Sequence, residues 1–245
     1  MLNNDLTTIT LKEIVNANFR AAAVFEKYSL DFCCRGGKSI ADACADKGIE
    51  AAPVVQDLLT IPADVQYTAD RFAEWDTAFL IDYIVNNHHA YVTKIIPVLA
   101  AHTQKIASVH GANHPEVITI AGHFAAVANE LLQHMQKEEM VLFPYIKSMA
   151  QAVKMGTPLP KSPFGTVANP IKMMEAEHQN AGDELYAVRS LSSGYTVPDD
   201  ACTTFRVTYQ ELQDFERDLH QHVHLENNIL FPRAVAWEQE LVARN

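Results

Sequence analysis

Residues 134–144, HMQKEEMVLFP, return in altered form as residues 222–232, HVHLENNILFP. The two stretches share a histidine, a glutamate four residues later and a final Leu-Phe-Pro. Residues four apart lie on the same face of an α-helix, so the histidine and the glutamate of each stretch can reach one metal ion or two adjacent ions. The repeat therefore predicts two helices that each present a His-x-x-x-Glu pair.

The hydrophobic residues around each pair predict that it faces the interior. His134 and Glu138 continue a stripe, with steps of three and four residues, that contains Phe124, Val127, Leu131 and Leu142. His222 and Glu226 continue a corresponding stripe of Leu212, Phe215, Leu219 and Ile229. A buried carboxylate costs several kcal/mol unless a partner neutralises it. Bound cations therefore explain both pairs better than a solvent-facing position does.

A further histidine precedes each pair. His178 precedes the second pair, and either His88 or His89 precedes the first, because each of these neighbours fits a hydrophobic stripe. His222 follows His134 by 88 residues and His178 follows His89 by 89, so the repeat favours His89. Six histidines have no counterpart in the repeat and are expected at the surface: His102, His110, His114, His123, His220 and His224.

The ligand types indicate two metal ions. Four imidazoles and two carboxylates are too many for one tetrahedral zinc ion, and magnesium and calcium prefer oxygen ligands. Two first-row ions fit, with two histidines each and with Glu138 and Glu226 as bridges. Redox iron suits this mixed set, while manganese and zinc stay open. A ferritin-like centre needs Glu-x-x-His on two helices, but the form occurs only at Glu175 and His178.

The chain divides into two predicted domains. Residues 77–245 read as two helical hairpins, which predict an all-α fold with a four-helix bundle. Residues 1–66 read as short helices interrupted by Gly36-Gly37, so we assign them to a small helical domain and residues 67–245 to the bundle.

The small domain contains adjacent cysteines. Cys33 and Cys34 lie beside Arg35 and Lys38, ahead of a helix that Ser39 can cap. Nearby cations and a helix N-terminus lower the pKa of a thiol. We therefore expect at least one ionised thiol and a redox role for the pair.

Bulk properties exclude several classes of function. The net charge is −11 and lysine and arginine form no cluster, which argues against nucleic-acid binding. No apolar run approaches the roughly 20 residues that span a bilayer. The first residues lack the pattern of a secretory signal, so we expect a cytoplasmic protein whose cysteines stay reduced.

Residues 31–38, DFCCRGGK, and residues 174–178, MEAEH, complete a pattern that includes both repeated stretches. With this pattern the chain resembles the repair-of-iron-centres family, hemerythrin-like di-iron proteins with an N-terminal Cys-Cys domain of the ScdA type. The resemblance implies a hemerythrin-like bundle with an oxo-bridged centre of two iron ions. Its implied ligands are His89, His134, Glu138, His178, His222 and Glu226, with both glutamates bridging.

The same resemblance implies repair of iron–sulfur clusters damaged by nitrosative or oxidative stress, through iron donation or nitric oxide removal. Implied partners are damaged iron–sulfur proteins, nitric oxide or another diatomic molecule, and a reductant; a homodimer stays open. The alternative is a nitric oxide reductase or a protein that binds nitric oxide or oxygen. Glu130 lies one helical turn before His134 and Glu177 directly precedes His178, so either can act as an outer acid or proton relay.

Overall fold

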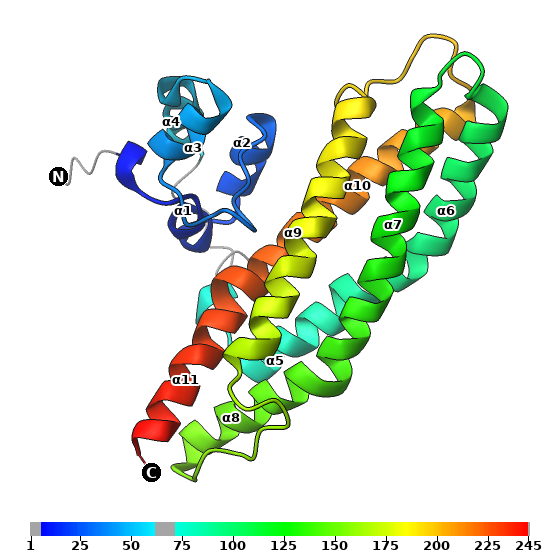
Figure 1. Ribbon diagram of the computed structural model, residues 1–245. Helices are drawn as coiled ribbons and strands as arrows, with labels where there is room; N and C mark the ends of the chain where they lie inside the picture. The colour runs from blue at the N-terminus through cyan, green and yellow to red at the C-terminus, as the bar shows by residue number, and fades with distance from the viewer. Residues whose placement is uncertain (1–5, 62–71, 245) are drawn as a thin grey trace. The chain divides into compact units, whose positions relative to one another are not determined.

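The computed structural model describes residues 6–61 and 72–244. In these ranges the regular secondary structure is helical, and no β-strand is present (Figure 1). Two compact units form: Met1–Leu80 with Val223–Arg233, and Ile81–His222 with Ala234–Asn245. The predicted domain boundary between residues 66 and 67 lies outside the described ranges. The predicted all-α fold is confirmed. None of the described helices is both long and apolar enough to cross a membrane.

The first unit contains short helices: α1 (Leu11–Ala17), α2 (Ala21–Lys27), α3 (Ile40–Lys47) and α4 (Ala51–Leu59). Side chains cap two of them. Thr10 and Glu13 form a capping box at α1, in which each side chain accepts a hydrogen bond from the other residue's backbone N–H. The predicted Ser39 cap is confirmed, because its Oγ accepts a hydrogen bond of 3.1 Å from the Asp42 N–H.

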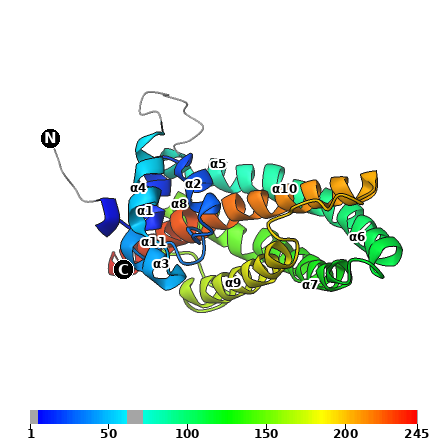
Figure 2. The same ribbon diagram turned by 90° about the horizontal axis from the view of Figure 1, so that it is seen from above.

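The second unit is a bundle of long helices that run side by side in both views (Figures 1 and 2). Its main helices are α6 (Ala90–His110), α7 (Glu116–Lys137), α9 (Ala168–Leu191) and α10 (Thr203–Leu225). The shorter helix α8 (Phe143–Met155) and most of α11 (Phe231–Ala243) also belong to this unit, whereas α5 (Thr77–Tyr83) begins in the first unit and ends in the second. Phe124 of α7 and Phe215 of α10, both fully buried, meet edge to face at 5.5 Å.

Within the described residues, three turns of π-helix interrupt the α-helices: Ile84–His89, Glu138–Leu142 and Glu226–Leu230. In the second, the Phe143 N–H donates to the carbonyl of Glu138, five residues earlier. Pro144 follows directly. A proline in an α-helix lacks an N–H and clashes with the carbonyl four residues before it, and a wider turn relieves this conflict. The repeated Leu-Phe-Pro thus accompanies a π-helical turn in both copies.

Candidate metal centre

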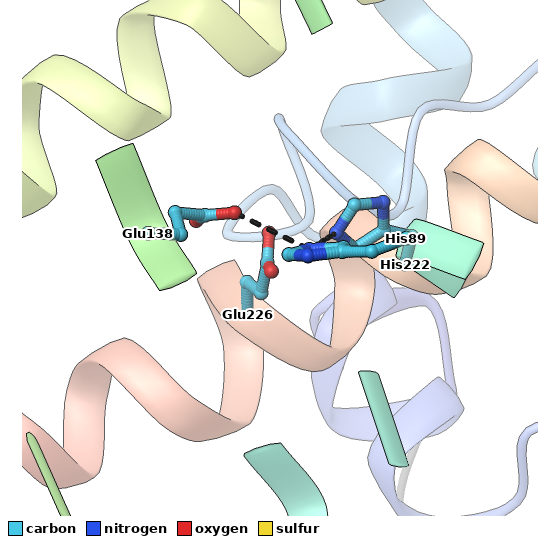
Figure 3. A group of neighbouring side chains, drawn as sticks. All are labelled: His89, Glu138, His222 and Glu226. Atoms are coloured by element: carbon cyan, nitrogen blue, oxygen red, sulfur yellow. Dashed lines mark hydrogen bonds and ion pairs between the residues drawn. The ribbon is translucent and has the colours of Figure 1, made fainter. Parts of the chain in front are cut away.

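The structure brings the six predicted ligands together. One group of converging side chains is His89, Glu138, His222 and Glu226 (Figure 3), and the other is His134, Glu138, His178 and Glu226. Within each group the potential ligand atoms lie within 4.8 Å of one another. Both carboxylates belong to both groups. Glu226 lies one turn after His222, where α10 passes into the π-helical turn Glu226–Leu230, so the helix backbone fixes its direction.

All six side chains are shielded from water, with at most 2% of each residue exposed. The Nε2 atoms of His89 and His222 are 3.1 Å apart, and those of His134 and His178 are 2.9 Å apart. The Glu138 Oε2 atom lies 3.5 Å from the His89 Nε2 and 3.3 Å from the His134 Nε2. Two imidazole pairs thus flank a carboxylate. This mixed nitrogen and oxygen set fits two first-row metal ions.

Carboxylates at the outer nitrogens orient two of the imidazoles. The His89 Nδ1 lies 2.8 Å from the Glu139 Oε1, and the His134 Nδ1 lies 2.8 Å from the Glu177 Oε2. A proton on Nδ1 that is donated to a carboxylate leaves the Nε2 lone pair for a metal ion. Glu177 also pairs with Lys137. Burial raises the pKa of the Glu177 carboxyl, but hydrogen bonds from Lys137 and His134 outweigh this and hold it below its usual value.

The geometry separates the two neighbouring histidines that the sequence pattern left open. His89 belongs to the cluster, whereas the His88 Nδ1 lies 2.9 Å from the Asp218 Oδ1. The His88 ring stacks on the ring of His222 at a centroid distance of 5.5 Å and an angle of 7°. Sequence reasoning missed Asp218 and Glu139. The only signal for Glu139 was its place beside Glu138, which resembles the place of Glu177 beside His178.

Two other predictions meet different outcomes. Glu130 is exposed on α7 and belongs to neither group. The surface prediction for His224 is wrong, because only 1% of this residue is exposed. Its ring lies 5.7 Å from the ring centroids of both Phe19 and Phe32. Burial lowers the pKa of His224 to about 3, so it is a neutral core residue.

The vicinal thiols lie in a turn of the first unit. The Asp31 Oδ1 accepts hydrogen bonds from the backbone N–H groups of Cys33, at 3.1 Å, and Cys34, at 2.8 Å. The hydrogen bond with Cys34, burial, and the charges of Cys34 and Asp31 raise the pKa of Cys33 well above its usual value. The expected lowering is therefore wrong for Cys33. Lys38, one of the two basic residues expected to lie beside the thiols, forms an ion pair with Asp46 instead.

The cysteine whose pKa is lowered is Cys202. Cys202 is exposed at the start of α10, and its Sγ lies 3.1 Å from the His110 Nε2. Hydrogen bonds from the backbone N–H of Phe205 and from His110 lower the pKa of Cys202 to about 7. Sequence reasoning missed this thiol because His110 precedes it by 92 residues.

An apolar cavity of about 340 Å³ lies in the second unit. Among its lining residues, Leu142 lies one helical turn from Glu138, and Met174 one turn from His178. The remaining lining residues are Lys137, Val141, Phe164, Asn169, Pro170 and Met173. The cavity therefore offers an apolar space whose walls adjoin two residues of the cluster.

Comparison with known proteins identifies two family matches. Residues 80–234 match the hemerythrin HHE cation binding domain, and residues 7–61 match a domain of unknown function, DUF542. The iron-sulfur cluster repair protein YtfE of Citrobacter koseri is 36% identical over 225 residues, which cover 89% of this chain and 93% of that protein. YtfE of Escherichia coli O157:H7 is 34% identical, with coverages of 89% and 93%. A probable iron-sulfur cluster repair protein of Haemophilus influenzae is 32% identical, with coverages of 88% and 91%.

Proposed function

This chain belongs to the hemerythrin HHE cation-binding family, and we propose that it is a di-iron protein that repairs iron–sulfur clusters damaged by nitrosative or oxidative stress. The observation that carries the proposal is the presence of Glu138 and Glu226 in both groups of converging donors. We assign His89 and His222 to one ion, and His134 and His178 to the other. Both glutamates would then be shared between the two ions.

The surrounding residues suit this assignment. Glu139 and Glu177 hold the Nδ1 atoms of two ligand imidazoles, which keeps their Nε2 atoms directed inward. Burial of the whole cluster excludes bulk water. Bound iron supplies redox chemistry and a releasable ion to this site. We propose Glu177 as the outer carboxylate that holds the Nδ1 proton of His134 in place, whereas the proposed relay role of Glu130 has no support from its exposed position.

The proposed substrates are damaged iron–sulfur proteins, to which the protein donates iron or from which it removes nitric oxide. Cys33 and Cys34 are the groups we assign to transient redox or iron-accepting steps, with a separate reductant as electron source. We place this activity in the cytoplasm, and a homodimer is the assembly to test. Size-exclusion chromatography with light scattering measures that assembly directly.

A second candidate function is nitric oxide reduction or the binding of nitric oxide or oxygen. The apolar cavity beside Leu142 and Met174 favours it, because small apolar molecules partition into such spaces. Anaerobic mixing of the reduced, iron-loaded protein with nitric oxide, followed by gas analysis, separates the candidates. Catalytic release of nitrous oxide supports the reductase, whereas a stoichiometric reaction without nitrous oxide supports repair.

Iron content tests the proposed centre. We expect about two irons per chain after anaerobic reconstitution, with an absorption band from the oxo bridge. Glu138→Ala and Glu226→Ala should lose more iron to a chelator than His89→Ala, because we assign each glutamate to both ions and His89 to one. His102→Ala, outside the cluster, is the matched control and should retain wild-type iron. One tightly held zinc without the oxo band would refute the centre, and equal retention in all variants would refute the bridges.

A further inference from the structure

Asp31, Cys33 and Cys34 form a third group of converging donors, apart from the two groups of the bundle. Their carboxylate and thiol atoms lie within 4.8 Å of one another. We propose that these three side chains bind a thiophilic divalent cation of the zinc or ferrous iron class. If the protein delivers iron, which rests on the proposed function, this site gives the ion a thiol-rich holding position.

The donor spacing matches the coordination of such a cation. The two sulfur atoms are 3.7 Å apart, and the Cys33 Sγ lies 3.3 Å from the Asp31 Oδ1. A tetrahedral ion with metal–sulfur bonds of about 2.3 Å and metal–oxygen bonds of about 2.1 Å separates two sulfurs by about 3.8 Å and sulfur from oxygen by about 3.6 Å. The separations of the Cys33 Sγ from the other two donors are therefore within a few tenths of an ångström of the required spacing, and the Cys34 Sγ lies within 4.8 Å of the carboxylate.

The turn that carries the donors is already ordered. Its Asp31 carboxylate accepts the two backbone hydrogen bonds from Cys33 and Cys34. The Asn228 Nδ2 donates to the carbonyls of Phe32, at 3.3 Å, and Cys33, at 3.2 Å. Phe32 itself is 1% exposed. Because these hydrogen bonds already fix the backbone of the turn, cation binding does not lose free energy to ordering it.

The charges of the cluster also favour a cation. A carboxylate and two thiols share a partly buried turn. The hydrogen bond with Cys34, burial, and the charges of Cys34 and Asp31 disfavour the Cys33 thiolate and raise the pKa of Cys33. A divalent ion removes this conflict, because it neutralises the carboxylate and stabilises the thiolates. Two sulfur donors select zinc or ferrous iron over magnesium and calcium, and three protein donors leave a fourth position open to an incoming thiol.

Cobalt is the probe that tests this site, because thiolate-bound Co²⁺ has a sulfur-to-metal charge-transfer band that histidine and carboxylate ligands do not produce. The full chain, with its bundle loaded with iron, is titrated anaerobically with Co²⁺. We expect one equivalent of the band, and its loss in Cys34→Ser. Asp31→Asn should weaken binding at least about tenfold. Its amide oxygen can still accept both backbone hydrogen bonds, so the turn is retained.

Cys202→Ser is the matched control, since it removes an exposed thiol far along the chain and should leave the band unchanged. Absence of the band, its persistence in Cys34→Ser, unchanged affinity in Asp31→Asn, or its loss in Cys202→Ser would overturn the proposal. Iron content, measured on the same samples, keeps the two proposals apart. If the bundle binds iron and the cobalt charge-transfer band is absent, only the thiol site is overturned. If the band appears and the bundle binds no iron, the thiol site is supported and the di-iron centre is contradicted.

Discussion

Replacement of Glu138 by glutamine should change the stability of the protein in opposite directions with and without metal. Glu138 has no exposed surface, and its Oε2 lies 3.3 and 3.5 Å from two imidazole nitrogens. Without metal, the buried charge is unfavourable, so an uncharged side chain of the same shape should stabilise the fold. With metal, the same change removes a bridging ligand and should destabilise it.

The magnitudes follow from burial and from ligand linkage. Replacement of buried ion pairs by uncharged residues stabilises proteins by up to about 1–4 kcal/mol, and we take the same range for removal of this buried charge. A domain of this size gains roughly 2–4 °C in Tm per kcal/mol, so the metal-free variant should melt about 2–16 °C above the metal-free wild type. Metal at about 100 times its Kd stabilises by about 2.7 kcal/mol. A variant whose Kd rises about a hundredfold loses about 2.3 kcal/mol of this, or roughly 5–9 °C.

Thermal unfolding followed by far-ultraviolet circular dichroism measures both effects, in chelator and after reconstitution. A pH of about 8 lies above the ordinary pKa of histidine. Glu130→Gln is the matched control, because this exposed carboxylate lies on the same helix and should change stability by less than about 0.5 kcal/mol in either state. If Glu138→Gln lowered the Tm equally in the metal-free and the metal-loaded protein, the reasoning would be refuted.

Three further changes have defined outcomes. Arg189→Leu should cost about 3–5 kcal/mol in urea unfolding, because it strips the bidentate partner from Glu216, which is 2% exposed. Iodoacetamide at neutral pH should label Cys202 first, since its pKa of about 7 makes half of it thiolate there, and its rate should rise as pH increases through 7. Cys33, whose pKa is raised, should react only at higher pH. Glu177→Gln should weaken metal binding about 10–100-fold in competition with a chelator.

Each of these has a control. The double change of Arg189 and Glu216 to leucine should recover most of the lost stability, and additive losses would count against a buried ion pair. Mass spectrometry assigns the labelled cysteine, and prior labelling of Cys33 would contradict the pKa order. Glu175→Gln changes an exposed carboxylate on the same helix as Glu177 and should leave metal affinity intact. Equal weakening in both variants would point to net charge as the cause.

The bundle and the converging ligands could be predicted because helical spacing is fixed. Once the stripes around His134 and His222 were recognised, the side chains four residues later had to share their faces. The choice between His88 and His89 could not be made from periodicity, because the π-helical turn that contains both departs from a period of 3.6 residues. The repeat, which compares whole hairpins, and the family resemblance both favoured His89, the residue that joins the cluster.

Features that depend on contacts distant in sequence stayed beyond prediction. Asp218 meets its histidine across 130 residues, so only the packing of two helices brings them together. The raised pKa of Cys33 arises from its hydrogen bond with Cys34 and its burial, to which the Asp31 carboxylate adds. Lys38, which we expected to act as the counterion of the thiols, pairs with Asp46. Charged residues that are close in sequence need not lie close together in the folded turn, so sequence alone does not predict the pKa of a thiol there.

The three π-helical turns also make the metal centre sensitive to single-codon changes. Each turn holds one residue more than an α-helical turn, and that residue rotates the side chains beyond it by about 100° around the helix axis. Deletion of one codon in such a turn restores a continuous α-helix and directs the following side chains elsewhere. A single deletion in such a turn is therefore expected to displace core residues such as Phe143 or Phe231 together with the ligand geometry, and so to weaken metal binding and destabilise the fold at the same time.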